Sequence, residues 1–302
     1  MNNGTMRLVG TLLGLAALSS CLPTPARAHE ELAEIAVGPQ YDTTHVYIPS
    51  DKVDQFVSSF LATFGGKSTT QVVATVTPTP SSTSSQLLLT PAGTVSVFGF
   101  HTPIPYPFGA ERTGYLVTDI DVGVRVAHAA GAALLVAPFP DPIGRDAIIQ
   151  WPGGVNTQIY WHTKPPSYPP LQTFPENRVY VSPDGIAAFI RSYTAFTRGT
   201  VVSDDAQAPG IEIGRPGEIY RRVRIRSRFG FLTALVTDGH LPYPYGHELT
   251  GYAVNDLAAT LAKAKTAGVS VLVAPYAAAG RYAAMVEFPG GYIAEIHDTG
   301  RK

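Results

Sequence analysis

Residues 103–117 read Pro-Ile-Pro-Tyr-Pro-Phe-Gly-Ala-Glu-Arg-Thr-Gly-Tyr-Leu-Val, and residues 240–254 read His-Leu-Pro-Tyr-Pro-Tyr-Gly-His-Glu-Leu-Thr-Gly-Tyr-Ala-Val. Both stretches share the frame Pro-Tyr-Pro-aromatic-Gly-x-Glu-x-Thr-Gly-Tyr. Glu111 and its counterpart Glu248 lie 248 − 111 = 137 positions apart. A shared frame with so long a period indicates a duplicated domain rather than a solenoid of short repeats.

The composition bounds the kind of protein. The chain has 302 residues, enough for two domains, and 45% of them are hydrophobic. Only 15% are charged, with a net charge of −1 and no run of Lys or Arg. This balance argues against nucleic acid or an anionic membrane surface as a partner, because both are recognised through basic patches. The 29 Gly and 26 Pro indicate many strands joined by tight turns.

Residues 1–28 are predicted to be an export signal. Arg7 provides a positive start, residues 8–18 are apolar, and Ala26-Arg27-Ala28 is a small-x-small cleavage site. The apolar run is too short to span a bilayer, which takes about 20 residues. Residues 18–21 also resemble a lipoprotein signal in which Cys21 would be acylated. Either route predicts a periplasmic or secreted protein whose folded part has no cysteine.

Residues 29–41 are expected to form a leader and residues 42–163 the first domain. Hydrophobic periodicity predicts two successive strand–helix–three-strand units in that domain. The first unit has a helix from Ser50 to about Gly65 and a Pro/Ser/Thr-rich loop over residues 77–85. The second has a helix capped by Asp119. The strands are expected at residues 43–48, 71–76, 86–90, 94–100, 112–117, 133–137, 147–151 and 155–161.

Residues 164–175 contain five prolines and are predicted to be a stiff linker. Residues 176–299 then repeat the same order as a second domain. The predicted fold is therefore α+β, with four βαβββ units in two pairs.

Paired βαβββ units of this length resemble the vicinal oxygen chelate superfamily, which includes glyoxalase I, extradiol dioxygenases and bleomycin-resistance proteins. The family-like motifs are residues 251–257, Gly-Tyr-Ala-Val-Asn-Asp-Leu, and residues 288–296, Phe-Pro-Gly-Gly-Tyr-Ile-Ala-Glu-Ile. The resemblance implies that each pair folds its sheet into a cup. It also implies a divalent metal in the cup that chelates two neighbouring oxygens of a substrate.

Carried onto the first domain, the metal-ligand positions are His45, Arg112 and Gln158. Only His45 is a good ligand, because a guanidinium cannot bind a metal. The resemblance therefore implies a metal-free cup in which these three side chains hold an anionic or carbonyl-bearing ligand.

In the second domain the corresponding positions include Arg178 and Glu295. One interpretation is an ion pair between these two side chains in a polar cup. The other is a zinc, iron or manganese site made by His240, His247 and Glu295, on the expectation that His247 shares a strand face with Leu249.

Glu111 and Glu248 are candidate general bases at the cup mouths. Alternatively, each caps its turn or pairs with Arg145 or Arg281. Tyr106 and Tyr243 would line a pocket for a flat ligand or act as lids over the cores.

Two functions remain open. One is an enzyme on a small oxygenated molecule, of the isomerase, lyase or dioxygenase type. The other is a non-catalytic protein that binds and sequesters a small molecule. The fold does not decide between them, and the sequence predicts no oligomeric state.

Overall fold

The computed structural model describes Met1, Ile35 and residues 40–298. The predicted export signal, with Cys21, and nearly all of the predicted leader lie outside these residues. Residues 40–298 belong to one compact unit. Among the helices that the structure describes, none has the length and apolarity needed to cross a bilayer.

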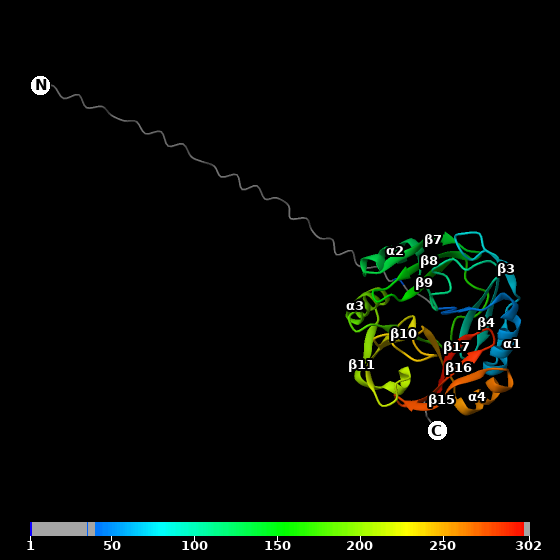
Figure 1. Ribbon diagram of the computed structural model, residues 1–302. Coiled ribbons are helices and arrows are strands. Elements are labelled where there is room, and N and C mark those ends of the chain that lie inside the picture. Colours follow the sequence, from blue (N-terminus) through cyan, green and yellow to red (C-terminus); the bar gives the residue numbers. More distant parts are fainter. Residues whose placement is uncertain (2–34, 36–39, 299–302) are drawn as a thin grey trace. The chain divides into compact units, whose positions relative to one another are not determined.

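The first half of this unit contains two βαβββ units (Figure 1). The first unit consists of β1 (Thr44–Tyr47), α1 (Val53–Phe64), the short β2 (Lys67–Ser68) and β3 (Val72–Ala74), β4 (Thr83–Thr90) and β5 (Gly93–Phe100). The second consists of β6 (Gly114–Leu116), α2 (Ile120–Ala129), β7 (Ala133–Pro140), β8 (Gly144–Gln150) and β9 (Asn156–His162). The expected loop over residues 77–85 is shorter than predicted, because β4 already begins at Thr83.

The second half repeats this order with longer strands. Its third unit consists of β10 (Glu176–Val181), α3 (Ile186–Thr197), β11 (Thr200–Pro209), β12 (Ile219–Ser227) and β13 (Gly230–Val236). Its fourth consists of β14 (Leu249–Ala253), α4 (Leu257–Thr266), β15 (Ser270–Ala278), β16 (Arg281–Phe288) and β17 (Tyr292–Asp298). The predicted α+β fold with four βαβββ units is therefore confirmed.

Both halves join their units in the same way. In the second half the eight strands form one sheet in the order β11-β12-β13-β10-β14-β17-β16-β15. In the first half β1 pairs in parallel with β5, and β6 with β9. A bridge between Thr44 and Thr113 connects these two groups of strands. The second half is thus one sheet, and the first half consists of two sheets joined by this bridge. We call the concave face formed by residues 44–162 the first cup and that formed by residues 176–298 the second cup.

Local sequence explains where the helices begin. Asp119 caps α2, its side chain accepting a hydrogen bond of 2.8 Å from the backbone N–H of Val122. Asp256 caps α4 in the same way through Ala259. Such a cap satisfies an N–H group that has no partner inside the helix.

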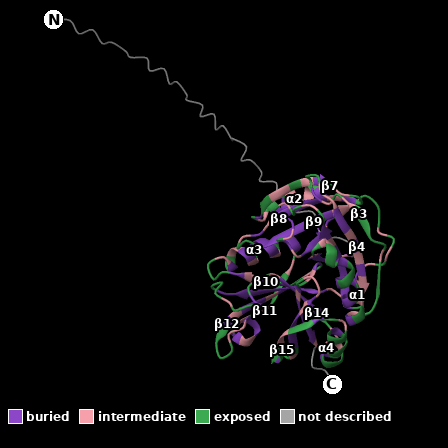
Figure 2. Cartoon of the chain, turned by 45° about the vertical axis from the view of Figure 1, so that its right-hand side comes forward, coloured by how far each residue is buried: buried purple, intermediate pink, exposed green. Residues whose placement is uncertain are grey.

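The hydrophobic core lies on the faces of the sheets opposite the cups and draws on both halves. One cluster combines α1 with the fourth unit and includes Phe56, Phe60, Tyr252 and Phe288. The helices α1 and α4 lie side by side there (Figures 1 and 2). A second cluster combines the second and third units around Trp151. Burying each large apolar side chain stabilises the fold by about 1.5–3 kcal/mol. The core therefore holds the backs of the sheets together and leaves the cups for polar groups.

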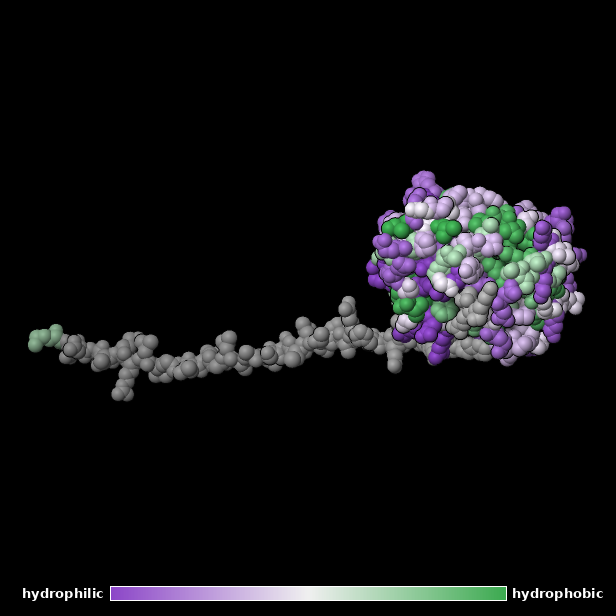
Figure 3. All heavy atoms as spheres, turned by 90° about the horizontal axis from the view of Figure 1, so that it is seen from below, coloured by the Kyte–Doolittle hydropathy of each residue, from purple (hydrophilic) through white to green (hydrophobic). Residues whose placement is uncertain are grey.

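The surface is less apolar than the core but is not uniformly polar. Figure 3 shows hydrophobic patches between hydrophilic ones on the face that it draws. Several large apolar side chains are exposed, among them Val72, Val73 and Ile143. Val72 and Ile143 line a cavity that opens from the first cup.

Candidate active site

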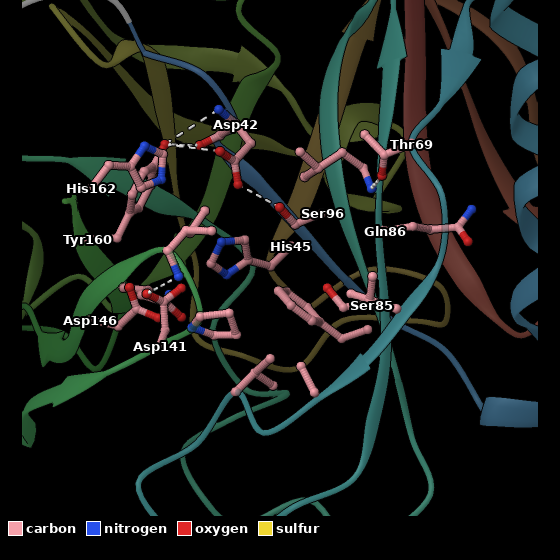
Figure 4. A pocket seen from close by; sticks show the side chains of 18 of the residues that line it. Asp42, His45, Thr69, Ser85, Gln86, Ser96, Asp141, Asp146, Tyr160 and His162 are labelled. Carbon is pink, nitrogen blue, oxygen red and sulfur yellow. Dashed lines mark hydrogen bonds between the residues drawn. The ribbon is translucent and has the colours of Figure 1, made fainter. Parts of the chain in front are cut away.

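A cavity of about 290 Å³ lies in the first cup. Strands β1, β4, β5, β8 and β9 supply most of its polar side chains, and loop residues complete it (Figure 4). The polar and titratable lining residues are Asp42, His45, Thr69, Thr70, Ser85, Gln86, Ser96, Asp141, Asp146, Gln158, Tyr160, His162 and Tyr168. Tyr47, Phe98 and Phe108 supply aromatic surface. At about 300 Å³ the volume is at the small end of ligand pockets.

His45 lies on β1 and is only 2% exposed. Its Nδ1 is 3.4 Å from Oε1 of Glu111, a residue of the duplicated stretch that is 0% exposed. The hydroxyl of Tyr47 donates a hydrogen bond to the same carboxylate oxygen. Burial, and then the charge of Glu111, raise the pKa of Tyr47, so this hydroxyl keeps its proton. Glu111 therefore lies behind the imidazole and orients it.

Gly114 makes room for this imidazole. A Cβ atom at this position would lie 2.6 Å from Nε2 of His45, closer than side chains tolerate. Gly114 is paired in register with Gln158 on β9, and Gln158 also lines the cavity. Gln158 and His45 therefore line the same cavity, on strands that both lie next to β6.

Three carboxyl groups line the cavity: Asp141 and Asp146 lie close together, and Asp42 lies beside Ser96 (Figure 4). Asp42 accepts a hydrogen bond of 2.5 Å from Ser96. Burial, and then the charges of Asp141, Asp42 and Glu111, raise the pKa of Asp146 well above its usual value. Burial also raises the pKa of Asp141. No Lys or Arg is among the described residues that line the cavity.

The second cup is occupied by ion pairs. Arg178 and Glu295 are both buried and lie 3.1 Å apart, and Arg281 lies 2.8 Å from Glu176. Arg281 also contacts Glu295, at 3.1 Å. Burial opposes the ionisation of Glu295, but Arg178 and then Arg281 outweigh it and lower the pKa of Glu295 to about 2. The structure thus contains the Arg178–Glu295 ion pair, which was one of the two interpretations of the sequence.

Further side chains fill the space around these ion pairs. Arg222 pairs with the buried Glu212 at 2.6 Å, and Tyr220 donates a hydrogen bond to Glu212. Tyr245 and Tyr276 are buried as well. The second cup is therefore packed with its own charged and aromatic groups.

Arg112 does not line the cavity in the first cup. It lies in a separate cleft of about 360 Å³ with Asn156, Tyr180, His247 and Glu248. Its guanidinium carbon is 5.8 Å from the ring centroid of Tyr47. Of the three residues expected to hold a ligand together, His45 and Gln158 share the cavity and Arg112 lies elsewhere.

The alternative prediction that Glu111 and Glu248 pair with Arg145 or Arg281 is wrong. Arg145 pairs with Asp121, and Arg281 pairs with Glu176 and Glu295. Glu248 instead accepts a hydrogen bond of 3.4 Å from the hydroxyl of Thr113. Burial raises the pKa of Glu248 to about 8, although Arg112 opposes this shift.

The structure does not bring His240, His247 and Glu295 together. The side chain of His240 is 90% exposed beside Asp238, His247 lies in the cleft with Arg112, and Glu295 is buried among its ion-pair partners. Within residues 40–298, no three His, Cys, Asp or Glu side chains converge so that they could hold a metal ion. His240, His247 and Glu295 therefore do not fit the divalent metal that the resemblance implies.

The tyrosines of the duplicated stretch are on the surface. Tyr106 and Tyr243 are exposed, each precedes a cis proline, and neither lines the cavity in the first cup.

The roles of Tyr47, Gly114 and the aspartates that line the cavity were not predicted from the sequence. Tyr47 follows His45 by two positions on a strand, so the same alternation that placed His45 could have placed it.

The fold of the chain is shared with several solved enzyme structures. A mutant of 4-hydroxymandelate synthase from Streptomyces coelicolor superposes with a TM-score of 0.57 at 14% identity, over 86% of this chain and 93% of that one. The 2,3-dioxygenase LapB from Pseudomonas sp. KL28 gives 0.53 at 9% identity, over 88% and 93%. A Mn(II)-bound glyoxalase from Novosphingobium aromaticivorans gives 0.52 at 10% identity, over 88% and 84%. At such identities the likeness establishes the fold only.

No protein-family model matches the sequence, and no curated protein matches it either.

Proposed function

We propose that the first cup is an active site that transfers a proton to or from a small oxygen-bearing molecule, with His45 as the general base. The observation that carries this proposal is the chain of contacts from the cavity through His45 to the buried Glu111 and Tyr47. An imidazole backed by a carboxylate is suited to accept and return a proton near neutral pH.

Gln158 has a complementary role in this proposal. Its amide N–H can donate a hydrogen bond to a carbonyl oxygen of the substrate, which gains negative charge when a neighbouring C–H loses its proton. Such a donor stabilises the enolate more than the ketone. The reaction class is therefore enolisation, isomerisation or elimination next to a carbonyl group.

The contrast between the halves supports the choice of cup. The first cup has a cavity lined by polar groups, whereas in the second cup the equivalent of His45 is Arg178, which is tied to Glu295. A duplicated fold in which one copy keeps an open site needs the other copy only for stability.

Deuterium exchange tests this proposal without knowledge of the natural substrate. Protein comprising residues 29–302 is incubated in D₂O with a panel of hydroxy ketones, amino ketones and aldehydes, and NMR follows loss of the C–H signal next to the carbonyl. We expect catalysed exchange of at least one compound, reduced about 100-fold or more in His45→Gln. His128→Gln, an exposed histidine on α2, is the matched control and should leave the rate unchanged.

Equal exchange in the wild type and His45→Gln would contradict the proposal. Binding of panel compounds without any exchange would favour the second candidate, a protein that only sequesters its ligand. The polar, partly aromatic cavity is equally compatible with tight binding.

We further propose that the protein is exported. Residues 1–28 carry the features of an export signal, and mass spectrometry of the mature protein from a bacterial host tests it. The account predicts an N-terminus at His29. A lipid-modified Cys21 would favour the lipoprotein route instead, and an unprocessed chain in the cytoplasm would contradict export.

A further inference from the structure

The charge of the cavity in the first cup is one-sided. Its described lining includes the carboxyl groups of Asp42, Asp141 and Asp146, and no Lys or Arg. The nearest arginine of the duplicated stretch, Arg112, lies in the neighbouring cleft. His45 and His162 are the only basic side chains of the described lining, so an anionic ligand would meet three carboxyl groups without a permanently charged cation to balance it.

Asp146 is the most informative of these groups. It lies on β8, is 6% exposed and lines the cavity. Asp42 is hydrogen-bonded by Ser96 and by Tyr160, and Asp141 by the backbone N–H of Ile143. None of the described residues donates a hydrogen bond to the carboxyl of Asp146 or forms an ion pair with it. Because Asp146 lines the cavity and its carboxyl is not paired within the described protein, this carboxyl is available to a ligand.

Aromatic side chains also line the cavity. The rings of Phe98 and Tyr47 lie with centroids 5.4 Å apart, and Phe108 packs edge-on against Phe139, which pairs with Asp146 in the sheet. Aromatic faces bind apolar groups and also attract cations.

We infer that the ligand of the first cup is a small organic amine that binds as its cation, with the ammonium group at Asp146 and its neighbours and the apolar body against Phe98, Tyr47 and Phe108. This inference specifies the substrate class of the site proposed above and rests on that proposal. It reverses the expectation of an anionic ligand, which depended on Arg112.

The carboxyl groups and the aromatic side chains of the cavity can bind different parts of one molecule. An amine placed at Asp146 presents the rest of its skeleton toward His45 and Gln158, which line the same cavity. The positive charge also makes a nearby C–H more acidic, which helps His45 to remove the proton. An amino ketone would satisfy both requirements.

A charge series at constant shape tests the inference. Benzylammonium, benzyl alcohol and benzoate are titrated into protein comprising residues 29–302 at pH 8, with ligand-observed NMR as the measurement. We expect benzylammonium to bind about tenfold more tightly than benzyl alcohol, because hydrogen bonds to charged groups are the stronger ones, and benzoate to bind most weakly.

Variants then locate the charge. Asp146→Asn should weaken benzylammonium about tenfold and leave benzyl alcohol unchanged. Asp121→Asn is the matched control, since Asp121 is an exposed residue on α2 that pairs with Arg145, and it should change neither affinity. If Asp146→Asn does not fold, Asp141→Asn and the charge series on the wild type still decide.

Three results would overturn the inference: benzoate binding as tightly as benzylammonium, no binding of benzylammonium at about 20 mM, or equal effects of Asp146→Asn and Asp121→Asn. Failure of the proposed function is a separate result. Exchange that is independent of His45, together with a preference for the cation, would contradict the proton-transfer role and leave the amine site standing.

Discussion

The carboxylate of Glu111 lies 3.4 Å from Nδ1 of His45, whereas the equivalent Glu248 of the second copy contacts neither the equivalent Arg178 nor its ion-pair partner Glu295. The duplicated frame of residues therefore lies in a different environment in each half. In the first half the glutamate turns toward the cup and orients a histidine. In the second half it accepts a hydrogen bond from Thr113, a residue of the first copy. The two copies of the glutamate therefore have different contacts.

Glu111→Gln should lower the rate of catalysed exchange while leaving the fold intact. The amide cannot balance the positive charge that His45 acquires as it accepts a proton, so the rate should fall about tenfold or more. The comparison is Glu248→Gln at the equivalent position, which should leave the rate unchanged. Exchange rates and far-UV circular dichroism of both variants provide the measurement, and equal rates for wild type and Glu111→Gln would count against the orienting role.

Gly114→Ala should displace the imidazole of His45. The new methyl group would lie 2.6 Å from Nε2, so the ring must move, and we expect loss of exchange with a destabilisation of about 1–3 kcal/mol. Gly251→Ala is the matched control, because its Cβ would meet Arg178, Glu176 and His297 at 3.4 Å, an ordinary contact. Urea unfolding and exchange kinetics should separate the two variants. Full activity in Gly114→Ala would show that the ring position is not critical.

Glu295→Gln should destabilise the protein without affecting the first cup. Removing this carboxylate leaves Arg178 buried without a main partner, which costs about 3–5 kcal/mol at pH 7. The folded pKa of Glu295, about 2, is below its unfolded value, so its stabilisation is present above about pH 4.5 and is lost as pH falls toward 2. Unfolding curves between pH 3 and 7 measure this, and a large loss of exchange activity in the folded variant would instead place the active site in the second cup.

Glu248→Gln should change how stability depends on pH. The folded pKa of Glu248, about 8, is above its unfolded value, so the wild type loses stability from this group as pH rises from about 4.5 to 8. The amide does not ionise, and we expect a gain of about 2 kcal/mol at pH 8.5 and little change at pH 4.5, because partial exposure weakens the burial penalty. Denaturant titrations at both values test this. If the variant and the wild type had the same free energy of unfolding at both pH values, Glu248 would be ionised throughout this range.

The sequence was sufficient for the fold because the duplicated frame and the strand periodicities agree at every level. The order of all four units and the cap at Asp119 are as predicted. The site was harder, because it depends on where strands begin. Arg112 was expected on the first strand of the second unit, but β6 begins at Gly114, so Arg112 precedes the strand and lies outside the cup.

The same cause explains two other differences. His247 was expected on a strand face shared with Leu249, but β14 begins at Leu249 and His247 belongs to the preceding turn. Conversely, β8 begins at Gly144, earlier than residue 147, and this brings Asp146 into the sheet and onto the cavity wall. Hydrophobic periodicity defines the middle of a strand, whereas its ends depend on tertiary pairing that the sequence does not reveal.

The most direct test of the account asks which cup binds the ligand. Protein labelled with ¹⁵N at its eight histidines is titrated with the tightest-binding compound of the panels, and the imidazole signals are followed by NMR, with His45→Gln and His297→Gln used for assignment. The account predicts that the signals of His45 shift with the ligand, while those of His297, which lies 3.1 Å from Glu295 in the second cup, remain in place. Shifts of His297 with unchanged His45 signals would contradict it.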